Sequence, residues 1–402
     1  MKKTALYALL SVILGLITAG CRQKHAPAED RYVVVLSMDG FRSDYPDMAH
    51  TPTLDSLAGI GVKSAFRPCF PSATFPNHYS MATGLHPDHH GLIHNFFYAP
   101  DIDSVFTASC HDPRFFGGEP IWNTAEKQGI RTAAYFWIGS EIALPGGQPS
   151  IWKKFDKSVP FEDRADSVVA WLRLPEQIRP HLIMWYIEEP DNTGHDCGPD
   201  SLPTLRMAEK ADSLLRYFFD KARTLDVFHR TDFIVVSDHG MATCTAEHSV
   251  NLADYLPIDS FRYVFEGVPT LLYPKDGYAD KAYETLKTVP GITVWRKDEI
   301  PERFVYGKNP RVPELLVMPP AGSYVEFRDR PSQYNGGAHG YDNFMPEMEG
   351  IFYAAGPSFK KGEEFPAMPN VNLYPLIARL LGISPAPNDG NDSTVAELLT
   401  RK

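Results

Sequence analysis

The 402-residue chain has little positive charge, with 39 lysine and arginine residues against 50 aspartate and glutamate residues. Its formal net charge is −11, whereas proteins that bind nucleic acid rely on clustered positive charge to meet the phosphates. We therefore expect no stable complex with nucleic acid. Charged residues make up only 22% of the chain and hydrophobic residues 43%, which excludes a disordered tether and predicts a compact globular protein.

Cysteine is also scarce, with five residues in the whole chain, which excludes a mini-protein held together by disulfides. No spacing among them is typical of a zinc finger. In an exported protein the last four could form disulfides in any of three pairings or remain buried thiols, and the sequence leaves this open. The five are Cys21, Cys69, Cys110, Cys197 and Cys244.

The one uncharged run near the start of the chain, residues 4–19, is too short for an ordinary membrane span. Two lysines precede it, as in a secretion signal, and LITAGC ending at Cys21 resembles the cleavage box of a bacterial lipoprotein. We predict a signal peptide over 1–20, a lipid on Cys21 and a polar tether over 21–30. The mature chain would carry a net charge of −13 and be anchored to a bacterial cell-envelope membrane. An ordinary signal peptide with a chance cysteine is the alternative.

Four apolar runs predict buried strands, and helical patterns lie between them. Strands that alternate with helices favour a mostly parallel sheet covered on both faces. In such sheets ligands bind beyond the carboxyl ends of the strands, where Asp39, Asp191 and Asp238 fall. The strands are expected in RYVVVLSMDGF, HLIMWYIEEPD, TDFIVVSDHG and GIFYAAGPS; the helices are expected in TPTLDSLAGIG, PIWNTAEKQGI, RADSVVAWLRL, PTLRMAEKADSLLRYFFDKARTL and NVNLYPLIARLLGI.

Residues 249–334 differ from the rest, because short β-like pieces separated by proline and glycine replace the long alternation. Only one clear helix is predicted there. We interpret this stretch as a small α+β subdomain inserted into the main domain, 31–402.

Three carboxylates and three imidazoles in these motifs are the side chains that hold Zn²⁺. Six such ligands divide naturally into two sites of three. Two zinc ions bring a charge of +4 and the three aspartates −3, which leaves about +1 and suits a phosphodiester monoanion. The ligands are Asp39, Asp191, His195, Asp238, His239 and His339.

A nucleophile is also required, and Thr74 in PSATFPNHYS is the candidate, since a hydroxyl next to zinc loses its proton near neutral pH. The alternative is that Thr74 only caps the helix that follows. Five histidines on the same segment suggest a third metal site, but satisfied or exposed side chains are the favoured interpretation. They are His78, His86, His89, His90 and His94.

Five motifs in order, from residue 38 to 343, resemble the nucleotide pyrophosphatase/phosphodiesterase family of the alkaline phosphatase superfamily. They are MDGFRSDY, SATFPNHYSMATGLHPDHHGLIHN, YIEEPDNTGHDCGP, SDHGM and GGAHGYDN. The resemblance implies an alkaline-phosphatase-like α/β fold. It also implies a two-zinc enzyme that hydrolyses phosphodiester or pyrophosphate bonds of nucleotides and related small molecules through a phosphothreonine. Nothing in the sequence predicts a protein partner.

The resemblance also implies how the ligands are divided and what binds the substrate. Asp39, Asp238 and His239 would hold the zinc next to Thr74, and Asp191, His195 and His339 would hold the other. Asn95 matches the residue that contacts a nonbridging phosphate oxygen. Phe75 and Tyr186 match the aromatic pair around a nucleobase, and Trp137 is expected in the same pocket.

One departure weakens nucleotide specificity: Ala73 stands where many members have lysine. A phosphomonoesterase or a choline-phosphodiester hydrolase on the same scaffold is the alternative; the former would need an additional cation near Asn95. A noncatalytic binding protein would not require all six ligands and Thr74. CFPSA at 69–73 resembles a sulfatase signature but lacks its arginine.

Overall fold

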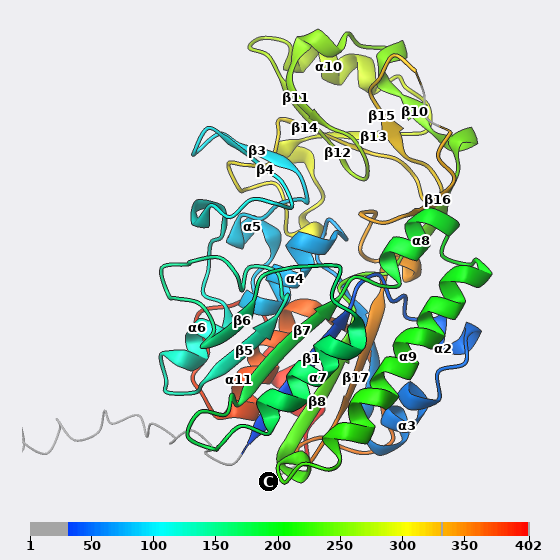
Figure 1. Ribbon diagram of the computed structural model, residues 1–402. Helices are drawn as coiled ribbons and strands as arrows, with labels where there is room; N and C mark the ends of the chain where they lie inside the picture. Colours follow the sequence, from blue (N-terminus) through cyan, green and yellow to red (C-terminus); the bar gives the residue numbers. More distant parts are fainter. Residues whose placement is uncertain (1–30, 331–332, 401–402) are drawn as a thin grey trace, which may run out of the picture.

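The computed structural model describes residues 31–330 and 333–400, so the predicted signal peptide, Cys21 and the tether lie outside the described residues. The main feature is an eight-stranded sheet in the order β18-β2-β17-β8-β1-β7-β5-β6 (Figure 1). Its strands are β1 (Tyr32–Met38), β2 (Val62–Arg67), β5 (Thr132–Tyr135), β6 (Ile151–Lys153), β7 (Leu182–Ile187), β8 (Thr231–Val236), β17 (Gly350–Ala355) and β18 (Glu363–Pro369).

The sheet is mostly parallel, as predicted. β1 pairs in parallel with β7 on one side and β8 on the other, so all three end at the same edge. Only β17 is reversed, since it pairs antiparallel with both β8 and β2. The apolar run of β17 predicted the strand but not its direction, because direction depends on the connections and not on the residues within a strand.

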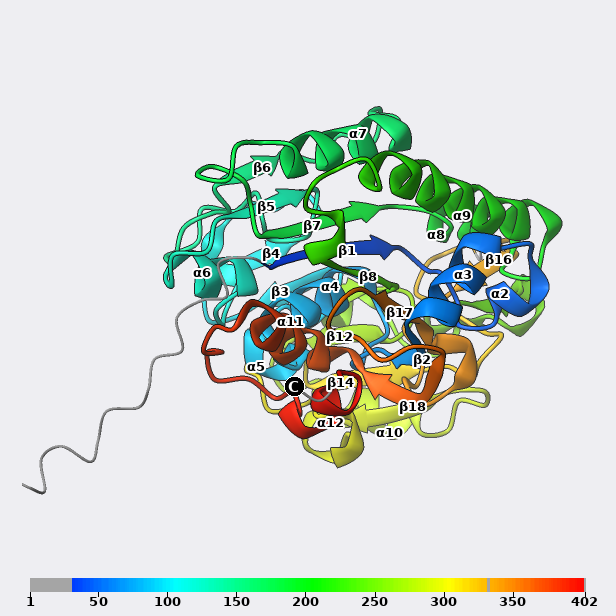
Figure 2. The same ribbon diagram turned by 90° about the horizontal axis from the view of Figure 1, so that it is seen from below.

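Helices cover both faces, and alternate residues of β1 point to the two cores (Figure 2). Val33 and Val35 belong to one hydrophobic core, whereas Val34 and Leu36 belong to the other. The first core includes α4 (Thr74–Thr83), α6 (Ile121–Glu126) and α11 (Leu373–Leu381); the second includes α3 (Pro52–Ile60), α7 (Phe161–Leu172) and α9 (Leu202–Ala222).

The start of α3 is capped from another helix. Thr51 is the N-cap residue, but its side chain makes no capping hydrogen bond. The carboxylate of Asp212 on α9 instead accepts hydrogen bonds from the backbone N–H groups of Thr53 and Leu54, at 3.1 and 2.9 Å. This long-range contact satisfies donors that a local cap would otherwise satisfy.

A second sheet lies within residues 249–334, and Figure 1 shows it beyond the edge where β1, β7 and β8 end. Its four strands are antiparallel and pack with one helix around a separate core. This content agrees with the short strands and single helix predicted there, while the boundary of the insertion remains a prediction. The elements are β11 (Phe261–Phe265), β12 (Thr270–Pro274), β13 (Thr293–Arg296), β14 (Leu315–Met318) and α10 (Ala279–Leu286).

The remaining helices and strands are short. None of the helices in residues 31–330 and 333–400 combines the length and apolar character needed to cross a membrane. The elements are α2 (Tyr45–Met48), α5 (Pro87–His90), α8 (Asp191–Cys197), α12 (Asp392–Glu397), and the strand pairs β3 (Phe97–Ala99) with β4 (Ser104–Phe106), β9 (Ala242–Cys244) with β16 (Gly336–Ala338), and β10 (Val250–Asn251) with β15 (Val325–Glu326).

Candidate active site

Three buried aspartates meet at the carboxyl edge of the main sheet. Asp39 follows β1 directly, Asp191 begins α8 just after β7, and Asp238 lies two residues after β8. The backbone N–H of Asp191 donates to the carbonyl of Asp39 at 3.0 Å. Gly40 makes this approach possible: its φ is +64°, and a Cβ there would lie 2.8 Å from the Cβ of Asp191. Its N–H also donates to Oδ1 of Asp238 at 3.1 Å.

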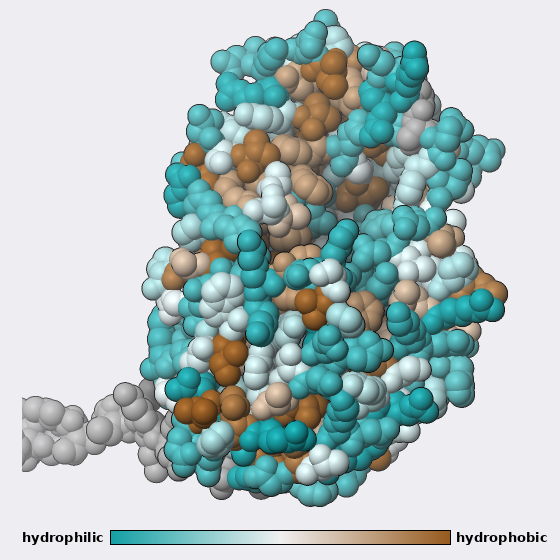
Figure 3. Space-filling view, viewed as in Figure 1, coloured by the Kyte–Doolittle hydropathy of each residue, from teal (hydrophilic) through white to brown (hydrophobic). Residues whose placement is uncertain are grey.

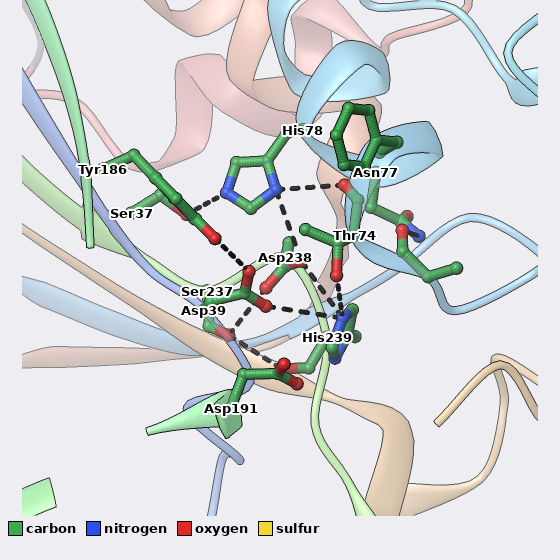
Figure 4. A network of polar contacts seen from close by, with 12 residues as sticks. Ser37, Asp39, Thr74, Asn77, His78, Tyr186, Asp191, Ser237, Asp238 and His239 are labelled. Atoms are coloured by element: carbon green, nitrogen blue, oxygen red, sulfur yellow. Dashed lines mark hydrogen bonds and ion pairs between the residues drawn. The ribbon is translucent and has the colours of Figure 1, made fainter. Parts of the chain in front are cut away.

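The first ligand group, formed by Asp39, Asp238 and His239, is fully buried (Figure 4). Nε2 of His239 lies 3.1 Å from Oδ2 of Asp238 and 3.6 Å from Oδ1 of Asp39. Nδ1 of His239 lies 2.9 Å from the carbonyl oxygen of Gly240, which keeps Nε2 directed at the carboxylates. The hydroxyl of Thr74 is 3.2 Å from the same Nε2. The group therefore meets the candidate nucleophile.

The second ligand group, formed by Asp191, His195 and His339, is more open. Nε2 of His195 lies 3.5 Å from Oδ2 of Asp191, and Nε2 of His339 lies 3.6 Å from Oδ1 of the same carboxylate. The two Nε2 atoms are 3.0 Å apart. The i, i+4 spacing of Asp191 and His195 on α8 places both on one face of the helix, as the sequence predicted.

The second group is oriented by backbone carbonyls and joins the first through stacked rings. Nδ1 of His195 contacts the carbonyl of Gly337, and Nδ1 of His339 that of Ser72, both at 2.8 Å. The His339 ring stacks on His239 with centroids 3.8 Å apart. His239 lies close enough to Asp191 and His339 to belong to this group as well. The two groups are therefore adjacent parts of one polar centre.

The electrostatics of this centre suit bound cations. One oxygen each of Asp39, Asp191 and Asp238 is buried without a hydrogen-bond donor. Burial, reinforced by repulsion from Asp238, raises the pKa of Asp39 well above its usual value, and burial likewise raises the pKa of Asp191. Burial opposes ionisation of Asp238 too, but His239 and His78 outweigh it and hold its pKa below the usual range. Three crowded carboxylates with free oxygens, facing imidazole nitrogens, match the donor set of divalent zinc.

Thr74 is the first residue of α4, and the capping position belongs to Ala73, so the capping interpretation of Thr74 is wrong. Its hydroxyl is free to face His239. The N–H of Phe75 donates to Oδ1 of Asn95 at 2.9 Å, which fixes the Asn95 amide beside the hydroxyl.

His78, which was interpreted from sequence as a merely satisfied histidine, lies within the network in Figure 4. Its Nδ1 is 3.3 Å from Oδ2 of Asp238 and 3.0 Å from the carbonyl of Thr74, and its Nε2 is 2.8 Å from the hydroxyl of Ser37. A single histidine inside a helical pattern gives no sign of this. The spacing of the motifs would reveal this role of His78 only if the packing of α4 opposite β8 were already known.

The remaining histidines of that segment divide into two kinds. His90 and His94 are buried, and burial lowers their pKa to about 3 and about 4, so both are neutral. Both agree with the interpretation of side chains whose hydrogen bonds are satisfied, with one exception. Nε2 of His94 has no hydrogen-bond partner. His86 and His89 are at least partly exposed and lie together with Asp389.

A cavity of about 490 Å³ opens beside the first ligand group, and the predicted aromatic residues line it. Phe75, Trp137 and Tyr186 all contribute to its wall. Tyr186 has a second role that the sequence did not reveal, because its hydroxyl donates to Oδ2 of Asp39 at 2.6 Å. Lys153 and Lys154 also line this cavity and supply positive charge that Ala73 does not.

A second cavity, of about 620 Å³, lies between the second ligand group and the smaller sheet. Asn95, His195 and His339 line one side. Arg328 lines the other and is paired with Glu266. Figure 3 shows apolar residues gathered among polar ones on the face where the smaller sheet meets the main body. The candidate metal-binding side chains at the edge of the main sheet thus face side chains from residues 249–334.

The cysteines of the described residues contribute to none of this. Cys69, Cys110, Cys197 and Cys244 are all free thiols, so none of the three possible pairings is present in the described part of the chain. Burial raises the pKa of the Cys69 thiol to about 12, which keeps it protonated.

Comparison with known proteins identifies relatives over almost the whole described chain. The family model described as "Type I phosphodiesterase / nucleotide pyrophosphatase" matches residues 33–342. The chain is 33% identical over 399 residues to the venom phosphodiesterase CdcPDE of Crotalus durissus collilineatus, covering 95% of this chain and 48% of the relative. It is 34% identical over 384 residues to ectonucleotide pyrophosphatase/phosphodiesterase family member 3 of Bos taurus, covering 91% and 44%. The chain thus spans about half the length of these curated relatives.

Among solved structures, murine ectonucleotide pyrophosphatase / phosphodiesterase 5 superposes with a TM-score of 0.89 at 32% identity. The match covers 92% of this chain and all of that chain, and it confirms the predicted alkaline-phosphatase-like α/β fold. The same murine protein was also solved as an inactive threonine-to-alanine variant in complex with AMP, with the same TM-score.

Proposed function

Because the chain belongs to the type I phosphodiesterase / nucleotide pyrophosphatase family, we propose that it is a two-zinc phosphodiesterase that hydrolyses nucleotides and related diesters. One observation carries the proposal. Two groups of ligands share a polar centre, and the hydroxyl of Thr74 lies 3.2 Å from His239 at that centre. A structural role would not require three buried carboxylates with unsatisfied oxygens.

The ligands would divide as the family resemblance implies. Asp39, Asp238 and His239 would hold the zinc beside Thr74, and Asp191, His195 and His339 would hold the other. When bound, the zinc ions would lower the pKa of a hydroxyl and offset negative charge in the transition state. The site's charge near +1 suits a diester monoanion better than a monoester dianion.

Thr74 would act as the nucleophile and form a phosphothreonine, which water would then hydrolyse. The position of Thr74 at the N-terminus of α4 favours an anion in front of it. Asn95 would donate its amide N–H to a nonbridging oxygen, because its carbonyl is held by the Phe75 N–H. In-line attack places the leaving group on the side of His195 and His339, where the second cavity opens.

The substrate base would bind in the first cavity between Phe75 and Tyr186, with Trp137 as part of the wall. The murine relative was solved in complex with AMP, which supports a nucleotide as the ligand. Diester preference over monoester is supported by the second cavity. Among its described lining residues, the only lysine or arginine is Arg328, and Glu266 already pairs with it.

Export and a lipid on Cys21 remain part of the proposal. They rest on the sequence of residues 1–21 alone. An exported diesterase could act on substrates outside the cytoplasm without competing for cellular nucleotides. Mass spectrometry of the protein from membranes would test this, with a diacylglyceryl Cys21 as the expected N-terminus and an unmodified N-terminus before or after Cys21 as the contrary result.

A panel of four chromogenic substrates tests the proposed reaction on the zinc-loaded protein. The four are bis-p-nitrophenyl phosphate, p-nitrophenyl phosphate, p-nitrophenyl thymidine monophosphate and p-nitrophenyl phosphocholine. We expect the thymidine diester to have the highest kcat/KM and the monoester to have the lowest. Faster hydrolysis of the monoester would make the protein a phosphomonoesterase. Faster hydrolysis of the choline diester would make a choline phosphodiester, and not a nucleotide, the preferred substrate.

A further inference from the structure

A second cluster of zinc-type ligands lies outside the centre described above, at the opposite end of α4 from Thr74. His86 immediately precedes the short helix α5, His89 lies within it, and Asp389 lies in the loop between α11 and α12. Oδ2 of Asp389 is 3.0 Å from Nδ1 of His86 and 2.7 Å from Nδ1 of His89. Residues 300 positions apart thus meet at one oxygen atom.

The backbone holds this cluster in place. The N–H of His86 donates to Oδ2 of Asp389 at 2.8 Å, and the N–H of Asp389 donates to the carbonyl of Gly84 at 2.7 Å. Gly84 has a φ of +67°, and a Cβ there would lie 2.8 Å from the Cβ of Asn388. The close packing that only glycine allows therefore fixes the carboxylate against the turn that carries the two histidines.

The ligand types and distances fit a zinc ion. The two Nδ1 atoms and one carboxylate oxygen all lie within 4.8 Å of one another. Tetrahedral zinc with bonds of about 2.0–2.1 Å needs its ligand atoms about 3.3 Å apart, so each nitrogen would move outward by a few tenths of an ångström. The side chains of His86, His89 and Asp389 are 22%, 45% and 24% exposed, which leaves one side open to a water as fourth ligand.

We infer that His86, His89 and Asp389 form a third zinc site that is structural and separate from the catalytic centre. The ion would replace the protons that now lie between the imidazole nitrogens and the carboxylate. It would tie the turn after α4 to the C-terminal segment that follows α11. Because α4 begins with Thr74 and ends at Thr83, the site supports the far end of the nucleophile helix without touching the substrate.

The sequence had favoured satisfied or exposed side chains for these histidines. That interpretation lacked the third ligand, because Asp389 is distant in the chain and lies in no recognisable motif. Hydrogen bonding alone is the competing explanation, and it requires no metal. The substitution His89→Gln distinguishes a zinc site from hydrogen bonding alone, because the new amide can still donate to Asp389 but is a poor zinc ligand.

The test compares the full chain with His89→Gln and with His111→Gln as a matched control. His111 is 48% exposed and also pairs with a carboxylate, that of Glu141 at 3.0 Å. After dialysis against zinc and removal of excess, metal analysis should find one zinc fewer per chain in His89→Gln than in wild type or His111→Gln. The difference is independent of how many ions the catalytic centre holds, so failure of the proposed function would not affect it.

A thermal melt gives a second measurement. Zinc at a hundredfold excess over its Kd should raise the Tm of wild type and His111→Gln by about 3 °C more than that of His89→Gln. Turnover of the thymidine diester should stay unchanged in His89→Gln. Asp389→Asn should also lose the third ion; if that variant fails to fold, His89→Gln decides the question. Equal zinc content and equal Tm shifts in wild type and His89→Gln would overturn the site.

Discussion

The two ligand groups of the candidate active site differ in how they are enclosed. Asp238 and His239 of the first group have no exposed side-chain surface, whereas 37% of the His195 side chain in the second group is exposed. The first group is built on the ends of two central strands, β1 and β8, whereas the second depends on α8 and the segment around β16. The rigid, buried group is next to the nucleophile. The open group faces the cavity where a leaving group would depart.

Under the proposed function, the two groups would have separate tasks. The buried group would strengthen electrostatic contacts and hold Thr74 in one position. The open group would admit water and release product. Substitutions in the first group should therefore cost more activity than substitutions in the second.

Among substitutions around the nucleophile, the largest expected effect is that of Asp238→Asn. Asp238 contacts His239, His78 and the N–H of Gly40, so losing its charge removes one partner of a buried network. We expect kcat/KM on the thymidine diester to fall roughly a thousandfold, because Asp238 would help to hold the zinc beside Thr74, which would supply several kcal/mol of transition-state stabilisation. Activity within tenfold of wild type would show that Asp238 is structural. Circular dichroism of the variant provides the folding control.

His195→Gln should have a smaller effect. The His195 side chain is partly exposed, so water can replace part of its role. The expected loss is about 10- to 100-fold in kcat/KM, and added zinc should restore part of the activity because mainly metal affinity is reduced. A loss as large as that of Asp238→Asn, with no recovery in zinc, would remove the distinction between the two groups.

His78→Gln tests the support behind the first group. The side chain connects Asp238 with Ser37 and with the carbonyl of Thr74, yet it contacts no substrate cavity. Loss of such a supporting partner costs roughly 10-fold or more in activity or metal affinity. We expect kcat to fall while KM stays within twofold. A change in KM alone would place His78 near the substrate instead.

The most selective effect is expected from Phe75→Ala. Stacking of a base on an aromatic ring is worth about 1–3 kcal/mol, so kcat/KM for the thymidine diester should fall by about 5- to 150-fold. The aryl diester bis-p-nitrophenyl phosphate should be affected less. Equal losses on both substrates would make Phe75 part of the wall without a role in base binding.

Local signals in the sequence predicted much of this structure. The apolar runs before Asp39, Asp191 and Asp238 predicted both the strands and the common edge at which the three carboxylates meet, because strand ends coincide in a parallel sheet. The family motifs predicted how the ligands divide between two zinc ions, and that division remains a prediction. Residues with strong local patterns and a family signature could therefore be predicted from the sequence.

Long-range contacts could not be predicted from the sequence. The backbone carbonyls that orient His195 and His339 have no side-chain signature in the sequence. The contact of Tyr186 with Asp39 depends on the pairing of β7 with β1. Asp389 joins His89 across 300 residues through a loop with no motif. Such contacts depend on how separate elements pack, which residue spacing along the chain does not encode.

The central claim is that Thr74 attacks phosphorus, and trapping the intermediate tests it most directly. A slow diester substrate should be mixed with the zinc-loaded protein, quenched in acid within one turnover and digested for mass spectrometry. The account predicts phosphate on the peptide containing Thr74 in wild type. It predicts phosphoserine and partial turnover in Thr74→Ser, and neither phosphopeptide nor significant turnover in Thr74→Ala. Near-normal turnover by Thr74→Ala would contradict the account and leave direct attack by water as the mechanism.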